Sequence, residues 1–123
     1  MLSKKIKTLS IVVPLYNEEK RVVKTLPKIE TFIKDFYKKT RIKPELILVN
    51  DGSVDNTLKI IKDSLNFKNT KIVSYKKNKG KGYALKQGFK KATGDYILFM
   101  DADLSTPLKH LYGFIKQDLN ETK

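Results

Sequence analysis

The chain has 123 residues, of which 40% are hydrophobic and 32% charged, with no cysteine and a formal net charge of +13. The apolar residues fall in periodic blocks, which favours one globular domain over disorder, and the lack of cysteine excludes disulfides and thiolate metal sites. No apolar run approaches the ~18 residues of a membrane span and the start lacks the apolar core of a signal peptide, so we expect a soluble, cytoplasmic segment.

Short β-rich runs alternate with amphipathic helical stretches, which predicts a mostly parallel sheet with covering helices. A first strand is expected over residues 8–14, with Pro14 ending it because proline has no amide hydrogen for the ladder. Asn17 is placed as the cap of a helix, and Pro27 is expected to kink or restart that helix. The apolar face of the helix is formed by Val22, Leu26, Ile29, Ile33 and Phe36.

The same alternation continues to the end of the chain. The further elements are expected as a strand over 46–49, a helix opening near 53–55, a strand over 70–75, a helix over about 83–92 and a strand over 95–100. Gly94 is placed as a left-handed helix cap, and Thr106–Pro107 as the start of a last helix. The predicted fold class is α/β, a Rossmann-like unit with a mostly parallel sheet and flanking helices.

Polar residues gather where three predicted strands end, at residues 16–19, 50–53 and 101–103. In open α/β sheets, ligands bind beyond the carboxyl ends of the strands. The convergence of the three groups therefore predicts a binding site at that edge of the sheet.

Asp101 and Asp103 follow the last predicted strand directly. Residues two apart on an extended chain project to the same side, and adjacent carboxylates call for a cation or protons between them. Ligation by oxygen alone suits Mg²⁺ or Mn²⁺ held jointly with substrate phosphates. A pair of solvated aspartates in a turn is the alternative interpretation.

Asp51 and the loop of residues 76–82 follow the neighbouring strands. The carboxylate of Asp51 could accept a hydrogen bond from a nucleobase, or could belong to a plain strand-to-helix turn. Lys79 and Lys81 could face a phosphate or a base, or could simply be solvated. Gly80-Lys-Gly82 lacks the third glycine of a dinucleotide fingerprint and the chain has no Walker A pattern, which disfavours both of those sites.

Four segments together resemble the successive signatures of family-two inverting glycosyltransferases with the GT-A fold. They are Ile11-Val-Val-Pro-Leu-Tyr-Asn-Glu-Glu19, Val49-Asn-Asp-Gly-Ser-Val-Asp-Asn-Thr57, Asn78-Lys-Gly-Lys-Gly-Tyr-Ala-Leu-Lys-Gln-Gly88 and Met100-Asp-Ala-Asp-Leu-Ser-Thr-Pro107. The likeness runs from about Leu9 to the C-terminus. The last two segments look most like the dolichyl- or polyprenyl-phosphate glucosyltransferases, with the related mannosyltransferases close behind.

The resemblance implies a role for each matching residue. Pro14, Tyr16, Asn17 and Glu18 would line the nucleotide pocket, Asp51 would bond the uracil or guanine edge, and Lys79 or Lys81 would lie near the base or phosphate. Asp101 would lie near the ribose or the metal shell, and Asp103 would ligate the Mg²⁺ or Mn²⁺ that bridges the diphosphate. The implied substrates are a nucleoside-diphosphate sugar, with UDP-glucose first, and a polyprenyl-phosphate acceptor.

Members of that family continue well past the second aspartate. We therefore expect residues 1–123 to be a truncated, N-terminal nucleotide-sugar-binding part, with the catalytic residues unassigned and any general base in the C-terminal half. Such a chain would bind nucleotide weakly, transfer little sugar, and expose apolar surface that favours a homodimer. A non-catalytic nucleotide-binding module, and a transferase acting on a saccharide acceptor, remain alternatives.

The positive charge has three possible interpretations. The lysines are spread along the chain, with clusters at 38–39 and 76–79, which is typical of solvated helix faces. Attraction to an anionic membrane on its cytoplasmic face is the second interpretation. Nucleic acid is not expected as a partner, because aromatic residues do not interleave with the lysines in a stacking pattern.

Overall fold

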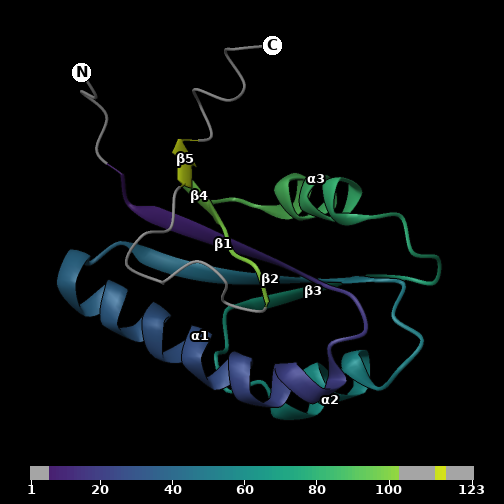
Figure 1. Cartoon of the computed structure of the whole chain (residues 1–123). Coiled ribbons are helices and arrows are strands. Elements are labelled where there is room, and N and C mark those ends of the chain that lie inside the picture. Colours follow the sequence, from purple (N-terminus) through teal and green to yellow (C-terminus); the bar gives the residue numbers. More distant parts are fainter. Residues whose placement is uncertain (1–5, 103–112, 116–123) are drawn as a thin grey trace.

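A five-stranded sheet in the order β3-β2-β1-β4-β5 is the middle layer of the computed structural model, which describes residues 6–102 and 113–115 (Figure 1). The strands are β1 (Thr8–Leu15), β2 (Lys43–Asp51), β3 (Thr70–Tyr75), β4 (Tyr96–Phe99) and β5 (Gly113–Ile115). The helices are α1 (Glu19–Thr40), α2 (Thr57–Ser64) and α3 (Lys81–Lys91). β1 to β4 are parallel and β5 is antiparallel to β4, so the predicted fold class is confirmed.

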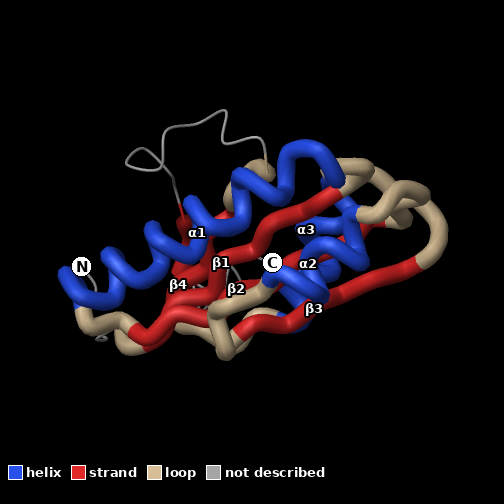
Figure 2. Tube along the Cα trace, turned by 90° about the horizontal axis from the view of Figure 1, so that it is seen from below, coloured by secondary structure: helices blue, strands red, loops and turns tan. Residues whose placement is uncertain are grey.

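The helices cover both faces of the sheet, with α1 and α2 on one face and α3 on the other (Figures 1 and 2). β1 is buried on both sides: Ile11 and Val13 belong to the core under α1 and α2, whereas Val12 belongs to the core under α3. A central strand of a parallel sheet is expected to be apolar in this continuous way. Because β1, β2 and β4 run in the same direction, their carboxyl ends meet at one edge.

Pro14 does not end the first strand, because β1 continues through Leu15 with Pro14 opposite Val49 of β2. On the other side of β1, β4 pairs only with residues Leu9 to Val12. Pro14 therefore lies beyond that ladder, where a missing amide hydrogen costs little.

Pro27 neither ends nor restarts α1, which runs unbroken from Glu19 to Thr40. Proline leaves the carbonyl four residues earlier, that of Val23, without its helical partner. Val23 and Pro27 are both on the exposed side of the helix, where water can bond that carbonyl. The opposite side stays packed on the sheet through Leu26 and Ile29, which holds the helix together through the proline.

Gly94 is not a left-handed helix cap, since Gly52 and Gly80 are the glycines with positive φ in the described part of the chain. A Cβ on Gly94 would lie 2.6 Å from the backbone nitrogen of Ser10. The absence of a side chain is needed there because the turn before β4 lies directly against β1.

The expected last helix starts at Thr106–Pro107, which lies outside the described residues. The next described residues, Gly113–Ile115, form β5 rather than helix. A three-residue strand is too short to show periodicity, and an antiparallel edge strand on a parallel sheet is common. No helix in the described ranges, 6–102 and 113–115, is long and apolar enough to cross a membrane.

Candidate functional site

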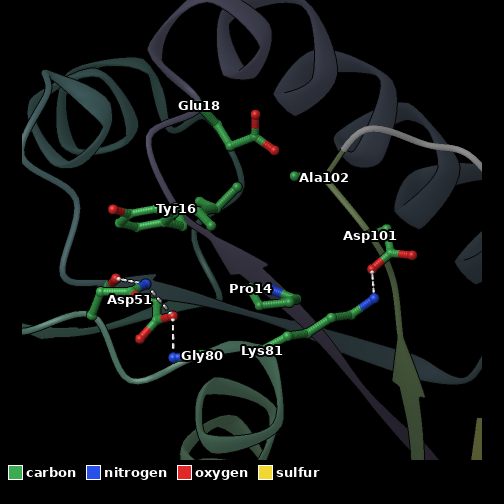
Figure 3. Close-up of a pocket in the computed structure, with 10 residues that line it drawn as sticks. Pro14, Tyr16, Glu18, Asp51, Gly80, Lys81, Asp101 and Ala102 are labelled. Atoms are coloured by element: carbon green, nitrogen blue, oxygen red, sulfur yellow. Dashed lines mark hydrogen bonds and ion pairs between the residues drawn. The ribbon is translucent and has the colours of Figure 1, made fainter.

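A cavity of about 400 Å³ opens at the carboxyl ends of β1, β2 and β4 (Figure 3). Its size lies within the range of small-molecule sites, about 300–1,000 Å³. The lining residues come from four strand ends or the loops after them: Pro14, Leu15, Tyr16, Glu18, Asp51, Asn78, Gly80, Lys81, Asp101 and Ala102. The predicted location of the site at this edge of the sheet thus agrees with a cavity of suitable size.

The wall formed by Tyr16 and Glu18 is a tight turn between β1 and α1. Asn17, between them, has the left-handed backbone conformation, with φ at 50°. Its side-chain oxygen accepts a hydrogen bond from the amide of Val54 at 2.9 Å and does not line the cavity. The residue at the helix N-cap is Glu18, whose side chain makes no capping bond, so the placement of Asn17 as the cap is wrong.

Asp51 fixes the opposite wall, the loop between β3 and α3. Its carboxylate is buried and accepts hydrogen bonds from the amides of Lys79 and Gly80, at 2.9 and 3.0 Å, and from Nδ2 of Asn78 at 2.9 Å. Gly52 makes this approach possible, since a Cβ on it would lie 2.3 Å from the backbone nitrogen of Asn78. A carboxylate can accept about four hydrogen bonds, so the three leave room for a ligand donor.

Lys81 and Asp101 carry opposite charges on the third side of the cavity. The Nζ atom of Lys81 lies 2.5 Å from Oδ1 of Asp101, which joins the first residue of α3 to the end of β4 (Figure 3). The cavity therefore holds a cation and carboxylates close together, an arrangement suited to a charged ligand.

Tyr75 is the neighbour of Asp51 on β3. The two residues are partners in the register of β2 and β3, and the Tyr75 ring makes an edge-to-face contact with Tyr83, with 5.3 Å between centroids. Burial, together with the negative charge of Asp51, raises the pKa of Tyr75 well above its ordinary value. The phenol thus stays protonated near the carboxylate at any physiological pH.

The structure brings together six of the predicted site residues, namely Pro14, Tyr16, Glu18, Asp51, Lys81 and Asp101. Asn17 does not line the cavity, nor does Lys79, whose ammonium group lies 5.9 Å from the centroid of the Tyr83 ring. Asp103 lies outside the described residues. Sequence reasoning missed Asn78, although its position two residues before Gly80 was a usable signal.

Comparison with known proteins gives the family. The family model described as "Glycosyl transferase family 2" matches residues 10–121. The chain belongs to glycosyl transferase family 2. The resemblance inferred from the four sequence motifs is thereby confirmed. Residues of those motifs line the cavity.

Curated proteins are similar over most of the chain. A dolichyl-phosphate beta-glucosyltransferase of Saccharomyces cerevisiae is 42% identical over 101 residues, which cover 77% of this chain and 29% of the relative. An undecaprenyl-phosphate 4-deoxy-4-formamido-L-arabinose transferase of Proteus mirabilis is 37% identical over 105 residues, covering 84% of this chain and 31% of the relative. The chain thus spans about a third of the length of these relatives.

Solved structures agree with this assignment. A structure of S. aureus TarS residues 1–349 in complex with UDP-GlcNAc has a TM-score of 0.66 and 30% sequence identity, covering 94% of this chain and 30% of that 1–349 chain. The mannosyltransferase PcManGT from Pyrobaculum calidifontis, in complex with GDP-Man and Mn²⁺, has a TM-score of 0.65 at 20% identity, covering 85% of this chain and 37% of that one. The second likeness shows the shared fold alone.

Proposed function

We propose that this chain is the nucleotide-sugar-binding part of an inverting, metal-dependent glycosyltransferase. Its donor would be a nucleoside-diphosphate sugar, with UDP-glucose as the leading candidate. Its acceptor would be a dolichyl or polyprenyl phosphate. Family membership supports transferase chemistry. The identity of the donor, the identity of the acceptor and the inverting stereochemistry are what we propose.

The observation that carries the proposal is the cavity that collects Tyr16, Asp51, Lys81 and Asp101. Tyr16 offers an aromatic ring, 47% exposed, on which a base can stack. Asp51 can accept a hydrogen bond from a base, and the ammonium of Lys81 can neutralise phosphate charge. TarS, which covers almost all of this chain, has been solved with UDP-GlcNAc, and this supports a uridine nucleotide as the ligand.

The acceptor is inferred from relatives. The similar proteins of S. cerevisiae and P. mirabilis are named as a dolichyl-phosphate glucosyltransferase and an undecaprenyl-phosphate arabinose-derivative transferase, so both names combine a sugar transferase with a lipid phosphate. A lipid phosphate is already ionised, so an inverting displacement onto it needs little help from a general base. Association with the cytoplasmic face of an anionic membrane, and formation of a homodimer, remain predictions that belong to this proposal.

We propose that a divalent cation binds close to Asp101, just after β4. Asp101 faces the cavity, but the described residues contain no cluster of three or more histidine or acidic side chains. Mg²⁺ and Mn²⁺ bind through one or two carboxylates with substrate phosphates completing the shell, so Asp101 and Asp103 are the proposed ligands. Such an ion would neutralise the charge that develops on the leaving diphosphate.

Calorimetric titration with UDP, with and without Mn²⁺, tests the proposal. We expect Mn²⁺-dependent binding that is abolished in Asp101→Ala and Asp103→Ala and retained in Asp63→Ala, an exposed carboxylate on α2. Absence of binding to both UDP and GDP by the folded protein would contradict it. Binding of GDP in preference to UDP would instead retain the transferase and replace UDP-glucose by a guanosine donor.

A further inference from the structure

Side chains in the segment 53–57, which leads into α2, accept hydrogen bonds from three consecutive backbone amides at and just before the start of α1. The amide of Asn17 donates to Oγ of Ser53 at 2.9 Å, that of Glu18 to Oγ1 of Thr57 at 2.8 Å, and that of Glu19 to Oδ2 of Asp55 at 3.2 Å. The first amides of a helix have no intrahelical partner, so side chains usually cap them. In α1 the caps come from a neighbouring loop rather than from the helix's own N-cap residue.

Asp55 is the centre of this contact. Its Oδ1 atom accepts hydrogen bonds from the amide and the hydroxyl of Thr57, at 3.0 and 2.5 Å, while Oδ2 reaches the amide of Glu19. Thr57 is the first residue of α2, and Glu19 is the first residue of α1. One carboxylate therefore bridges the starts of two helices, where the helix dipoles favour negative charge.

Asp55 also acts on Glu18 indirectly. The Thr57 hydroxyl donates its hydrogen to Asp55, which turns its lone pairs toward the amide of Glu18. Burial by itself raises the pKa of Asp55, but the hydrogen bonds from the side chain and amide of Thr57 and from the amide of Glu19 lower it on balance. The bridging group is thus ionised at neutral pH.

The hydrogen bonds to residues 53–57 bear on the cavity because they hold the turn that carries Tyr16 and Glu18. Both line it, and the backbone on which they stand is held by bonds to residues 53–57. Asp51, four positions before Asp55, holds the opposite wall through the amides of Lys79 and Gly80. Asp51 at the end of β2 and Asp55 in the segment that follows it therefore hold two different walls.

We propose that Asp55 is a positioning residue for the ligand cavity: by bridging the starts of α1 and α2, it holds Tyr16 and Glu18 in the orientation that binds the nucleotide. The inference rests on the proposed function for the identity of that ligand. Asp55 does not itself line the cavity, so its effect on binding must pass through the turn it holds.

The test compares Asp55→Ala and Asp55→Asn with the matched controls Asp63→Ala and Asp63→Asn, which change an exposed carboxylate on α2. Amide hydrogen exchange is measured by NMR at Glu18 and Glu19, and at Lys79 and Gly80 as internal references. The dissociation constant of UDP with Mn²⁺ is measured by calorimetry, and urea unfolding confirms that each variant is folded at the assay temperature.

For Asp55→Ala we expect about tenfold faster exchange at Glu18 and Glu19, with Lys79 and Gly80 unchanged, because the loss of a cap corresponds to about a factor of ten. UDP binding should weaken by about the same factor. For Asp55→Asn we expect exchange rates and a UDP dissociation constant between those of the wild type and Asp55→Ala. Its side-chain oxygen can still accept hydrogen bonds, but its NH₂ group would face a hydrogen-bond donor. The Asp63 variants should match the wild type.

Unchanged exchange at Glu18 and Glu19 would overturn the bridging role. Faster exchange with unchanged UDP affinity would overturn the positioning role and leave Asp55 as a helix cap alone. If the wild-type protein binds no UDP, the proposed function fails and so does the nucleotide part of this inference. The exchange rates would then still decide whether Asp55 holds the turn.

Discussion

Lys81 and Asp101 form an ion pair of 2.5 Å across the cavity, with the two side chains 61% and 37% exposed. An ion pair this exposed stabilises a fold by about 0–1 kcal/mol, because water screens the charges. The main effect of the contact is therefore to position the ammonium group of Lys81 rather than to stabilise the fold. It holds the positive charge of α3 next to the carboxylate that we propose as a metal ligand.

Lys81→Met should weaken UDP binding roughly tenfold, since a hydrogen bond to a charged group contributes about 1.5–3 kcal/mol. The free energy of unfolding should change by less than about 0.5 kcal/mol. Calorimetry and urea unfolding measure the two effects. Lys86→Met removes the same charge from an exposed position on α3 outside the cavity and should bind UDP normally. Equal losses in both variants would show that only general charge attraction is at work.

Asp51→Asn should destabilise the fold by about 1–3 kcal/mol, because the new NH₂ group would face the amide donors of Lys79 and Gly80. Urea unfolding measures this change. Hydrogen exchange at the same two amides should rise, while that at Glu19 stays as in the wild type. A variant as stable as the wild type would mean that the β3–α3 loop is held mainly by the close packing of Gly52 on Asn78.

Gly94→Ala should cost about 1–3 kcal/mol of stability, because the added methyl would overlap the backbone of Leu9 and Ser10. Gly82→Ala is the matched control. It lies in α3, where an added Cβ would meet nothing within 4 Å, and alanine there should stabilise the helix by up to about 1 kcal/mol. Thermal unfolding of both variants should show shifts of opposite sign. A neutral Gly94→Ala would imply that the turn before β4 can move away from β1.

Glu45 should give the fold a dependence on acidic pH. Burial raises the pKa of its carboxyl, but hydrogen bonds from Ser10, Thr93 and Lys71 together lower it below its ordinary value of 4.5. A lowered pKa in the folded state means that the carboxylate stabilises the fold above pH 4.5 and that this stabilisation is lost as the pH falls through the folded-state value.

Urea unfolding at pH 7 and at about pH 3.5 should therefore show a smaller loss of stability on acidification for Glu45→Gln than for the wild type. The glutamine variant should already be less stable at pH 7, because its NH₂ group would face donors. Parallel pH profiles for the two proteins would contradict the prediction. The pKa of Asp55 is also lowered, so Asp55 contributes to the pH dependence of the wild type as well. The contribution of Glu45 is therefore the difference between the two pH profiles.

The sequence was sufficient to predict strands β1 to β4 and helices α1 to α3, because buried parallel strands and amphipathic helices have distinct periodicities, but it did not predict β5. It misplaced the start of α2, expected near Ser53–Asp55 and found at Thr57. Ser53 and Asp55 are good capping residues, but Ser53 bonds the turn before α1 and Asp55 bonds the starts of both α1 and α2, which no local pattern indicates. Capping preferences alone cannot distinguish a residue's own helix from a neighbouring one.

The site was predictable in location and less so in detail. Tyr16, Asp51 and Asp101 each follow or end a strand, so the topology of the fold was enough to place them. Asn78 was missed because its contact with Asp51 joins residues 27 apart through a loop of irregular shape. The requirement for Gly94 also depends on a distant partner, since its amide donates to the hydroxyl of Ser10, 84 residues earlier.

The central position of β1 has a consequence for how the chain folds. β1 is synthesised before the other described strands, yet its neighbour β4 lies far along the chain, and the amide of Asp95 bonds Thr8 across 87 residues. Pairings over such sequence distances are slow to form. Until β4 arrives, β1 presents an apolar, open edge of the kind that promotes aggregation during biosynthesis. The earliest of these strands to be made is therefore among the last to be fully enclosed.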